Sequence, residues 1–188
     1  KPAMERRADG SLVQTASLKR PSPVPAAQVP VTLPKGASVL DLGAGSGAMA
    51  LRLQDLGYAV TASDIVPDNF RLHGTVAFRE LNLNRDIEGF EPVDAVVAVE
   101  LIEHLENPRY FLRQCARLLK PGGTLLLTTP NIENPVSKAM FLRHGQFQWF
   151  SEVAYRHDGH ISPVCAQQLR LMAPDAGLRI ERLGSHGD

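Results

Sequence analysis

The sequence has few cysteines, no long apolar run and no excess of charge of either sign. Its two cysteines, Cys115 and Cys165, lie far apart and do not form a pair with metal-ligand spacing. This usage favours a reducing, cytoplasmic setting. No run of about 18 apolar residues occurs, so no membrane span is expected, and no signal peptide is visible.

The charge balance limits the classes of partner. The chain has 20 Lys and Arg against 20 Asp and Glu, which gives no support for a nucleic-acid partner. Hydrophobic residues make up 44% of the sequence, an ordinary share for a globular domain. A length of 188 residues then predicts one domain with one well-filled core.

The most informative stretch is 39–47, in which an apolar run reaches Asp41 and three glycines follow at alternate positions. Residues 48–56 have the pattern of a helix that stops at Gly57. A strand, a tight glycine loop and a helix in this order present backbone N–H groups to a nucleotide.

Two interpretations of this loop compete. Residues 43–48 fit the G-x-G-x-x-G/A pattern of a dinucleotide site, so a dinucleotide-dependent oxidoreductase is one candidate. Asp41 favours another cofactor, because an acid two residues before the first glycine would repel a pyrophosphate and suits a cationic amine.

Strand and helix patterns alternate from residue 38 to residue 130. This alternation predicts an α/β fold, with a doubly wound and mostly parallel sheet that has helices on both faces. The expected strands are 38–42, 57–64, 75–81, 93–99, 124–129 and 178–183, and the expected helices are 48–56, 109–119, 134–144 and 163–172.

The chain divides into segments of different composition. Residues 1–35 are predicted to be an irregular, proline-rich segment, because prolines at alternate positions from Pro21 to Pro25 favour extended backbone. Residues 36–188 form the predicted domain, and within it 132–162 departs from the regular alternation and is expected to be an insertion.

Four stretches together resemble the class I S-adenosylmethionine methyltransferases over about residues 36 to 183. They are the D-x-G-x-G-x-G loop, Asp64, the segment 100–105 and the segment 118–131. The chain is most similar to the ubiquinone-biosynthesis-like and type 11/12/23 small-molecule methyltransferases. The resemblance implies a Rossmann-like sheet that ends in an antiparallel pair of strands. Since the chain stops soon after one such strand, the last strand is expected to be absent, swapped or cut off.

The resemblance implies that S-adenosylmethionine is the cofactor. Asp41 and the loop backbone would hold its methionine end, and Asp64 would accept the two ribose hydroxyls. Ile65 would form an apolar wall for adenine. Asn82 stands where the family often has an acid, and the backbone N–H of Leu83 is an alternative adenine contact. The cofactor-binding candidates are therefore Asp41, Gly43, Ala44, Gly45, Gly47, Asp64, Ile65, Asn82, Leu83 and Glu100.

The implied activity is methyl transfer to a small-molecule acceptor, at a hydroxyl oxygen, and the insertion 132–162 would lie on the acceptor side. His104 and His160 are the candidate catalytic bases, since a neutral imidazole near pH 7 is well suited to take a hydroxyl proton. Their structural alternatives are a histidine packed at a helix start and a histidine that braces a loop. A methyltransferase fold that binds without catalysis is a further alternative.

A metal-assisted variant of the reaction uses the same region. Glu100, Glu103, His104 and the distant His160 resemble the metal-binding set of some methyltransferases, and two carboxylates with two imidazoles suit a divalent ion. The alternative is that Glu100 touches the cofactor and Glu103 is a favourable acid at a helix start. Three aromatic residues, Phe147, Trp149 and Phe150, either line an acceptor pocket or form a core cluster under a loop.

Overall fold

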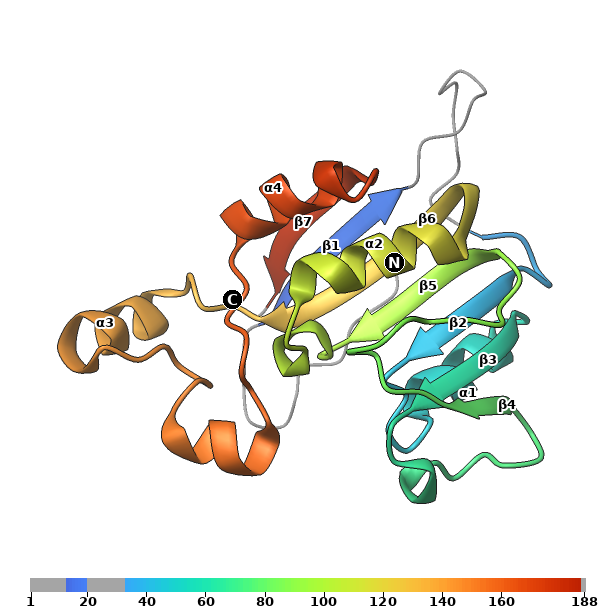
Figure 1. The fold of residues 1–188 in the computed structure, drawn as a ribbon, viewed down its shortest axis with the longest axis horizontal. Helices are drawn as coiled ribbons and strands as arrows, with labels where there is room; N and C mark the ends of the chain where they lie inside the picture. Colours follow the sequence, from blue (N-terminus) through green and yellow to red (C-terminus); the bar gives the residue numbers. More distant parts are fainter. Residues whose placement is uncertain (1–12, 20–32, 187–188) are drawn as a thin grey trace.

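The computed structural model describes residues 13–19 and 33–186, and these form a seven-stranded sheet in the order β4-β3-β2-β5-β6-β1-β7 (Figure 1). β2 pairs in parallel with β3 and β5, β3 with β4, and β5 with β6, whereas β1 runs antiparallel to both β6 and β7. The strands are β1 (Val13–Lys19), β2 (Ser38–Leu42), β3 (Ala59–Asp64), β4 (Ala77–Glu80), β5 (Val93–Val99), β6 (Leu119–Pro130) and β7 (Arg179–His186).

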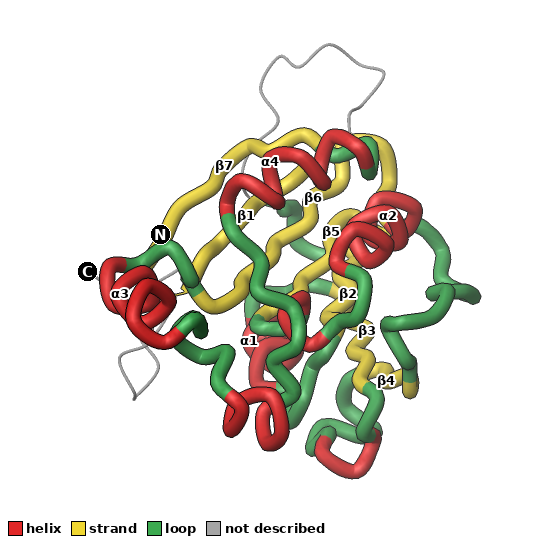
Figure 2. Tube along the Cα trace, turned by 60° about the vertical axis from the view of Figure 1, so that its left-hand side comes forward, coloured by secondary structure: helices red, strands yellow, loops and turns green. Residues whose placement is uncertain are grey.

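Helices cover both faces of the sheet. α2 and α4 lie on one face, and α1 lies on the other (Figures 1 and 2). This arrangement confirms the predicted doubly wound α/β class. The helices are α1 (Ala48–Asp55), α2 (Pro108–Leu118), α3 (Pro135–His144) and α4 (Ala166–Asp175), with short helical turns η1 (Pro67–Asn69), η2 (Ile102–His104) and η3 (Ala154–Asp158).

The alternation of side chains along β2 builds the core. Leu40 and Leu42 pack into the cluster that includes Phe111 of α2, which is fully buried. Val39 packs into a separate cluster with Met49 of α1. Because successive side chains in a strand point to opposite faces, Asp41 lies on the same face as Val39, toward α1.

The order of the strands places a topological switch point at one edge of the sheet. The chain runs from β2 outward to β3 and β4 on one side, whereas β5 and β6 lie on the other side of β2. The loops after β2 and β5 therefore diverge, and ligands of open α/β sheets bind at such a switch point, beyond the carboxyl ends of the strands. The chain leaves β6 at this edge, and α3 and η3 lie beyond it (Figure 1).

The structure corrects the prediction for the N-terminal segment. Residues 13–19, which fall within the expected irregular stretch 1–35, form β1. Ladders with β6 on one side and β7 on the other stabilise this strand, so long-range pairing outweighs a weak local signal. The predicted irregular backbone at 20–32, which includes the prolines from Pro21 to Pro30, lies outside the described residues.

The expectation that the last strand is absent, swapped or cut off is resolved by β1, which lies between β6 and β7. β7 has an antiparallel partner, and that partner is β1 from the N-terminal part of the chain. The antiparallel pair that the resemblance implies is therefore present in the sheet, but its two strands come from opposite ends of the chain. A sequence pattern that follows chain order does not reveal such a pairing.

Candidate functional site

The loop between β2 and α1 depends on three glycines with left-handed backbone. Their φ angles are 71° at Gly43, 53° at Gly45 and 92° at Gly47, a region that side chains disfavour. A Cβ at Gly43 would lie 2.8 Å from Leu101 Cδ1, and one at Gly47 would lie 2.8 Å from a Phe70 ring carbon. A Cβ at Gly45 would meet nothing within 4 Å. Gly43 and Gly47 thus permit close packing, while Gly45 leaves open space against the loop backbone.

Asp41 is a buried acid directly before this loop. It is 2% exposed, and its Oδ2 has no hydrogen-bond partner within the described part of the chain. Burial raises the pKa of Asp41 to about 7; the backbone N–H of Ala50 in α1 opposes this shift, and the charge of Asp64 adds to it. A carboxylate held in this way favours a cationic ligand group.

Asp64 ends β3 and supports the glycine loop. Its Oδ2 accepts a hydrogen bond from the Gly45 N–H at 2.8 Å, and its Oδ1 accepts one from the Val66 N–H at 3.0 Å. The next residue, Ile65, is an apolar side chain with 56% of its surface exposed. The structure therefore brings Asp41, the loop and Asp64 together and leaves an exposed apolar side chain beside them.

The sequence candidates after β4 lie differently. Asn82 is exposed, and its side-chain carbonyl accepts a hydrogen bond from the Asn84 N–H at 3.0 Å, as in an Asx turn. The Leu83 side chain is buried in the main core. The Leu81 N–H donates to the carbonyl oxygen of Asp64, so this segment starts beside the end of β3. A role of Asn82 or Leu83 in adenine binding stays a prediction.

Glu100 begins the loop after β5, on the other side of the switch point from the glycine loop. Its φ is 49°, an unfavourable value for a residue with a side chain. Thr128 of β6 holds it, because the Glu100 N–H donates to Thr128 Oγ1 and Oγ1 donates to Glu100 Oε1 at 2.9 Å. The Glu100 carboxylate is thus fixed just beyond the carboxyl end of β5, at the switch point of the sheet.

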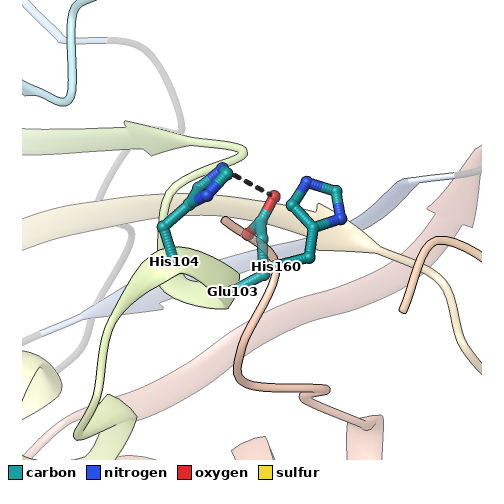
Figure 3. A group of neighbouring side chains, drawn as sticks. All are labelled: Glu103, His104 and His160. Atoms are coloured by element: carbon teal, nitrogen blue, oxygen red, sulfur yellow. Dashed lines mark ion pairs between the residues drawn. The ribbon is translucent and has the colours of Figure 1, made fainter. Parts of the chain in front are cut away.

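Glu103, His104 and His160 form a compact group in which one ligand atom of each lies within 4.8 Å of the others (Figure 3). Glu103 Oε1 is 4.0 Å from His104 Nε2, and the two imidazole rings pack edge to face with centroids 4.9 Å apart. Glu103 is fully buried, and its Oε2 accepts a hydrogen bond from Thr129 Oγ1 at 3.0 Å. Glu100 is not a member of this group, so three of the four predicted metal ligands converge.

Both histidines are held at their Nδ1 atoms by backbone carbonyl groups. His104 Nδ1 is 3.2 Å from the Gly159 oxygen, and His160 Nδ1 is 2.7 Å from the Trp149 oxygen. Burial lowers the pKa of His104, and the neighbouring His160 lowers it further, while the Gly159 carbonyl opposes the shift. A histidine with a lowered pKa is neutral, and able to accept a proton, near pH 7.

The loop that carries His160 is fastened to η2. The N–H groups of Ile161 and Ser162 both donate to the carbonyl oxygen of Glu103, each at 2.9 Å. Ser162 Oγ donates to the Leu105 oxygen at 2.6 Å. These bonds hold His104 and His160 next to one another, although the two residues are 56 positions apart in the sequence.

Three residues contribute to the site in ways that the sequence did not reveal. Thr128 and Thr129 end β6, and their buried hydroxyls hold Glu100 and Glu103. Trp149 has a φ of 69° and a buried Nε1 without a hydrogen-bond partner among the described residues. A threonine pair at the end of a buried strand next to β5 is the pattern that would have indicated the first two residues.

Comparisons with known proteins identify the family. A family model described as a methyltransferase domain matches residues 17–183, which is most of the chain. The chain belongs to this methyltransferase family. The resemblance to class I methyltransferases is confirmed, and the methyl donor of that class is S-adenosylmethionine.

Relatives and solved structures agree with the family. A ubiquinone biosynthesis O-methyltransferase of Caulobacter vibrioides is 37% identical over 106 residues, 52% of this chain and 42% of that protein. One of Xanthomonas axonopodis pv. citri is 30% identical over 161 residues, 79% of this chain and 65% of that protein. The chain thus spans less than two thirds of these curated relatives.

The fold similarity extends to solved methyltransferases with low sequence identity. An S-adenosylmethionine dependent methyltransferase from Mesorhizobium loti matches with a TM-score of 0.59 and 16% identity, over 80% of this chain and 78% of that one. One from Archaeoglobus fulgidus matches with a TM-score of 0.57 and 21% identity, over 76% and 61%. These likenesses confirm the Rossmann-like fold. Within the described residues, no helix is long and apolar enough to cross a membrane.

Proposed function

We propose that the domain binds S-adenosylmethionine between the loops after β2 and β5 and transfers its methyl group to a hydroxyl oxygen of a small molecule. The observation that carries this proposal is the buried Asp41 carboxylate beside the open side of Gly45. The curated relatives, which are O-methyltransferases of ubiquinone biosynthesis, make hydroxylated aromatic compounds the first acceptors to test.

The residues present fit this cofactor. Asp41 Oδ2 lacks a partner among the described residues, and a cationic amine supplies the opposite charge that a buried carboxylate needs. Gly45 leaves its side of the loop open to a ligand, and the α1 N-terminus follows directly. Asp64 and Ile65 would hold the ribose and the adenine. The same carboxylate disfavours a pyrophosphate, which weighs against a dinucleotide-dependent oxidoreductase.

The chain's own groups would then position an acceptor and take its proton. When bound, the cofactor supplies a methyl group on a sulfonium, which a nucleophile attacks in line. His104 and His160 lie at the end of the loop after β5, and either imidazole would accept the hydroxyl proton as the oxygen attacks. Glu103, buried beside His104, would stabilise the imidazolium that results.

A divalent ion is a second way for this cluster to act. One carboxylate and two imidazoles within 4.8 Å form a donor set that suits a divalent transition metal. A bound ion would lower the pKa of an acceptor hydroxyl, so that no histidine need take the proton. Calorimetric titration with Mn²⁺ and with Zn²⁺, repeated on Glu103→Gln, distinguishes the two cases, because an imidazole base requires no ion.

The deciding experiment is a calorimetric titration with S-adenosylhomocysteine and, in parallel, with NAD. Micromolar binding of the first and none of the second supports the proposal, and binding of NAD alone contradicts it. A panel of catechols and hydroxylated quinones is then assayed for cofactor-dependent methylation with wild type, His104→Gln and His160→Gln. Cofactor binding without methylation of any of them would favour a non-catalytic binding module. The cytoplasmic setting belongs to the same proposal, and the free thiols of Cys115 and Cys165 agree with it.

A further inference from the structure

The backbone of Trp149 has a conformation that its own side chain disfavours. The Phe150 N–H donates to the Phe147 oxygen at 3.1 Å, which closes a turn over residues 147–150 with Trp149 in its third position. Among the described non-glycine residues only Glu100 and Trp149 have positive φ, so the φ of Gln148 is negative. Of the four common hydrogen-bonded β-turns, types I, II, I′ and II′, only type II has a negative and then a positive φ, and its third position is normally glycine or asparagine.

The turn is fixed in place by the start of α3. The Gln148 N–H donates to Ser137 Oγ at 3.1 Å, and Asn134 Nδ2 donates to Gln148 Oε1 at 3.2 Å. Asn134 and Ser137 are both buried, and the Asn134 side chain also caps α3 through the Ser137 N–H. These contacts over-determine the turn, which is the condition under which unfavourable backbone persists.

The result of this turn is the direction of the Trp149 carbonyl group. Its oxygen lies 2.7 Å from His160 Nδ1. Because a carbonyl oxygen only accepts hydrogen bonds, Nδ1 carries the proton, and a neutral ring then has its lone pair on Nε2. In the same way, the Gly159 carbonyl oxygen favours a proton on Nδ1 of His104. The Phe150 ring also packs against His160, with the two ring centroids 5.5 Å apart. The imidazole is therefore held both by the hydrogen bond at Nδ1 and by a ring contact.

We propose that Trp149 is a positioning residue: its carbonyl group, oriented by the type II turn, fixes His160 in the tautomer that has its lone pair on Nε2, beside His104 and Glu103. The backbone of Trp149 is what acts, and the indole is not required. The proposal deepens the proposed methyl transfer and rests on it for its catalytic meaning. The tautomer itself is a property of the protein alone.

The first test is the tautomer of His160 in the wild-type chain, measured at pH 8 by long-range ¹H–¹⁵N correlation with S-adenosylhomocysteine present. Protonated and unprotonated imidazole nitrogens have well-separated ¹⁵N shifts, and comparison with His160→Gln assigns the signals. We expect the protonated signal at Nδ1. A proton at Nε2 overturns the proposal without any further variant.

The second test compares two variants that both lose the indole and differ in their tolerance of positive φ. Asparagine adopts this conformation readily, whereas valine, which is β-branched, does not. Trp149→Asn is expected to keep the wild-type ¹⁵N pattern, and Trp149→Val to show a mixture of both tautomers. An unchanged pattern in Trp149→Val, or the loss of the Nδ1 proton in Trp149→Asn, contradicts the proposal.

Catalysis gives a third and independent measurement. For any acceptor that wild type methylates, kcat of Trp149→Val should fall about 3- to 10-fold below that of Trp149→Asn, the range expected for one hydrogen bond. Equal kcat values would overturn the catalytic part of the proposal. The affinity for S-adenosylhomocysteine should be the same in both variants, since Trp149 is not among the cofactor candidates. Failure of wild type to bind this ligand would instead refute the proposed function and leave the tautomer result standing.

Discussion

Cofactor affinity should depend on pH through Asp41. The free domain holds this carboxyl with a pKa of about 7, because it is 2% exposed and Asp64 is near. A cationic amine favours the ionised form, so binding below pH 7 must release the proton from Asp41. The dissociation constant of S-adenosylhomocysteine should therefore rise about tenfold from pH 8 to pH 6, and about tenfold again by pH 5.

The assay is isothermal titration calorimetry between pH 5 and pH 8.5, repeated in buffers with different ionisation heats. At pH 6, binding should release close to one proton, and above pH 8 almost none. Asp41→Asn should weaken binding at pH 8 by at least tenfold and remove most of the pH dependence. Asp94→Asn is the matched control, because Asp94 lies on β5 and bonds to Ser38 and Lys120. Affinity that is constant from pH 6 to pH 8, or equal in Asp41→Asn, would refute this account of Asp41.

The same substitution should stabilise the free domain. A folded pKa of about 7 against an unfolded value of 3.8 means that the folded state binds more protons between these limits. Stability therefore falls as pH rises from about 4 to 7, by up to about 4 kcal/mol in total. Urea unfolding should find Asp41→Asn more stable than wild type above pH 7 and equal to it near pH 4. A less stable variant at pH 8 would show that Asp41 has a partner that stabilises its charge.

Three further outcomes are expected. Gly45→Ala and Gly36→Ala both add a Cβ at positive φ into open space, so each should cost about 1 kcal/mol in urea unfolding, but only Gly45→Ala should weaken S-adenosylhomocysteine binding, by tenfold or more. With S-adenosylmethionine saturating, so that protonation of Asp41 does not enter, the lowered pKa of His104 predicts that kcat/KM for the acceptor persists to a more acidic pH than with an ordinary histidine base; a His104→Gln variant with wild-type kcat would assign the base to His160 alone. Phe111→Ala should lower the free energy of unfolding by about 3 to 5 kcal/mol, because the ring is fully buried; a loss under 1 kcal/mol would contradict the packing of α2.

Most of the central sheet follows from local patterns. The nearly continuous apolar run at 93–99 predicts β5 with its bounds, since a strand buried on both faces has no polar positions to alternate. The glycine loop predicts the junction of β2 and α1 for the same local reason. β1 does not follow, because the strands with which it pairs come more than 100 residues later. Contacts over such separations leave no periodic trace in a single sequence.

The site has two halves, one with Asp41, Asp64 and Glu100 and one with Glu103, His104 and His160. They also differ in how far the local sequence predicts them. Asp41, Asp64 and Glu100 were predictable, because an acid at the end of a parallel strand must face the ligand edge of the sheet. The pairing of His104 with His160 was not, since it depends on hydrogen bonds from Ile161 and Ser162 to the backbone of Glu103. The sequence names both histidines as candidates, and only the fold shows that their rings meet.

Within the described residues, strained backbone and buried acids lie together at the edge of the sheet where the parallel strands end. These features bear on whether the domain is an enzyme. The two non-glycine residues with positive φ, Glu100 and Trp149, both lie here, as do the buried acids Asp41 and Glu103. Such features persist only where surrounding contacts enforce them, and they mark functional sites. Under the proposed function, a module that only bound the cofactor would use only the half with Asp41. It would have no use for a fully buried Glu103 beneath two histidines whose Nδ1 atoms are held by backbone carbonyl groups. The presence of both halves therefore favours catalysis over binding alone.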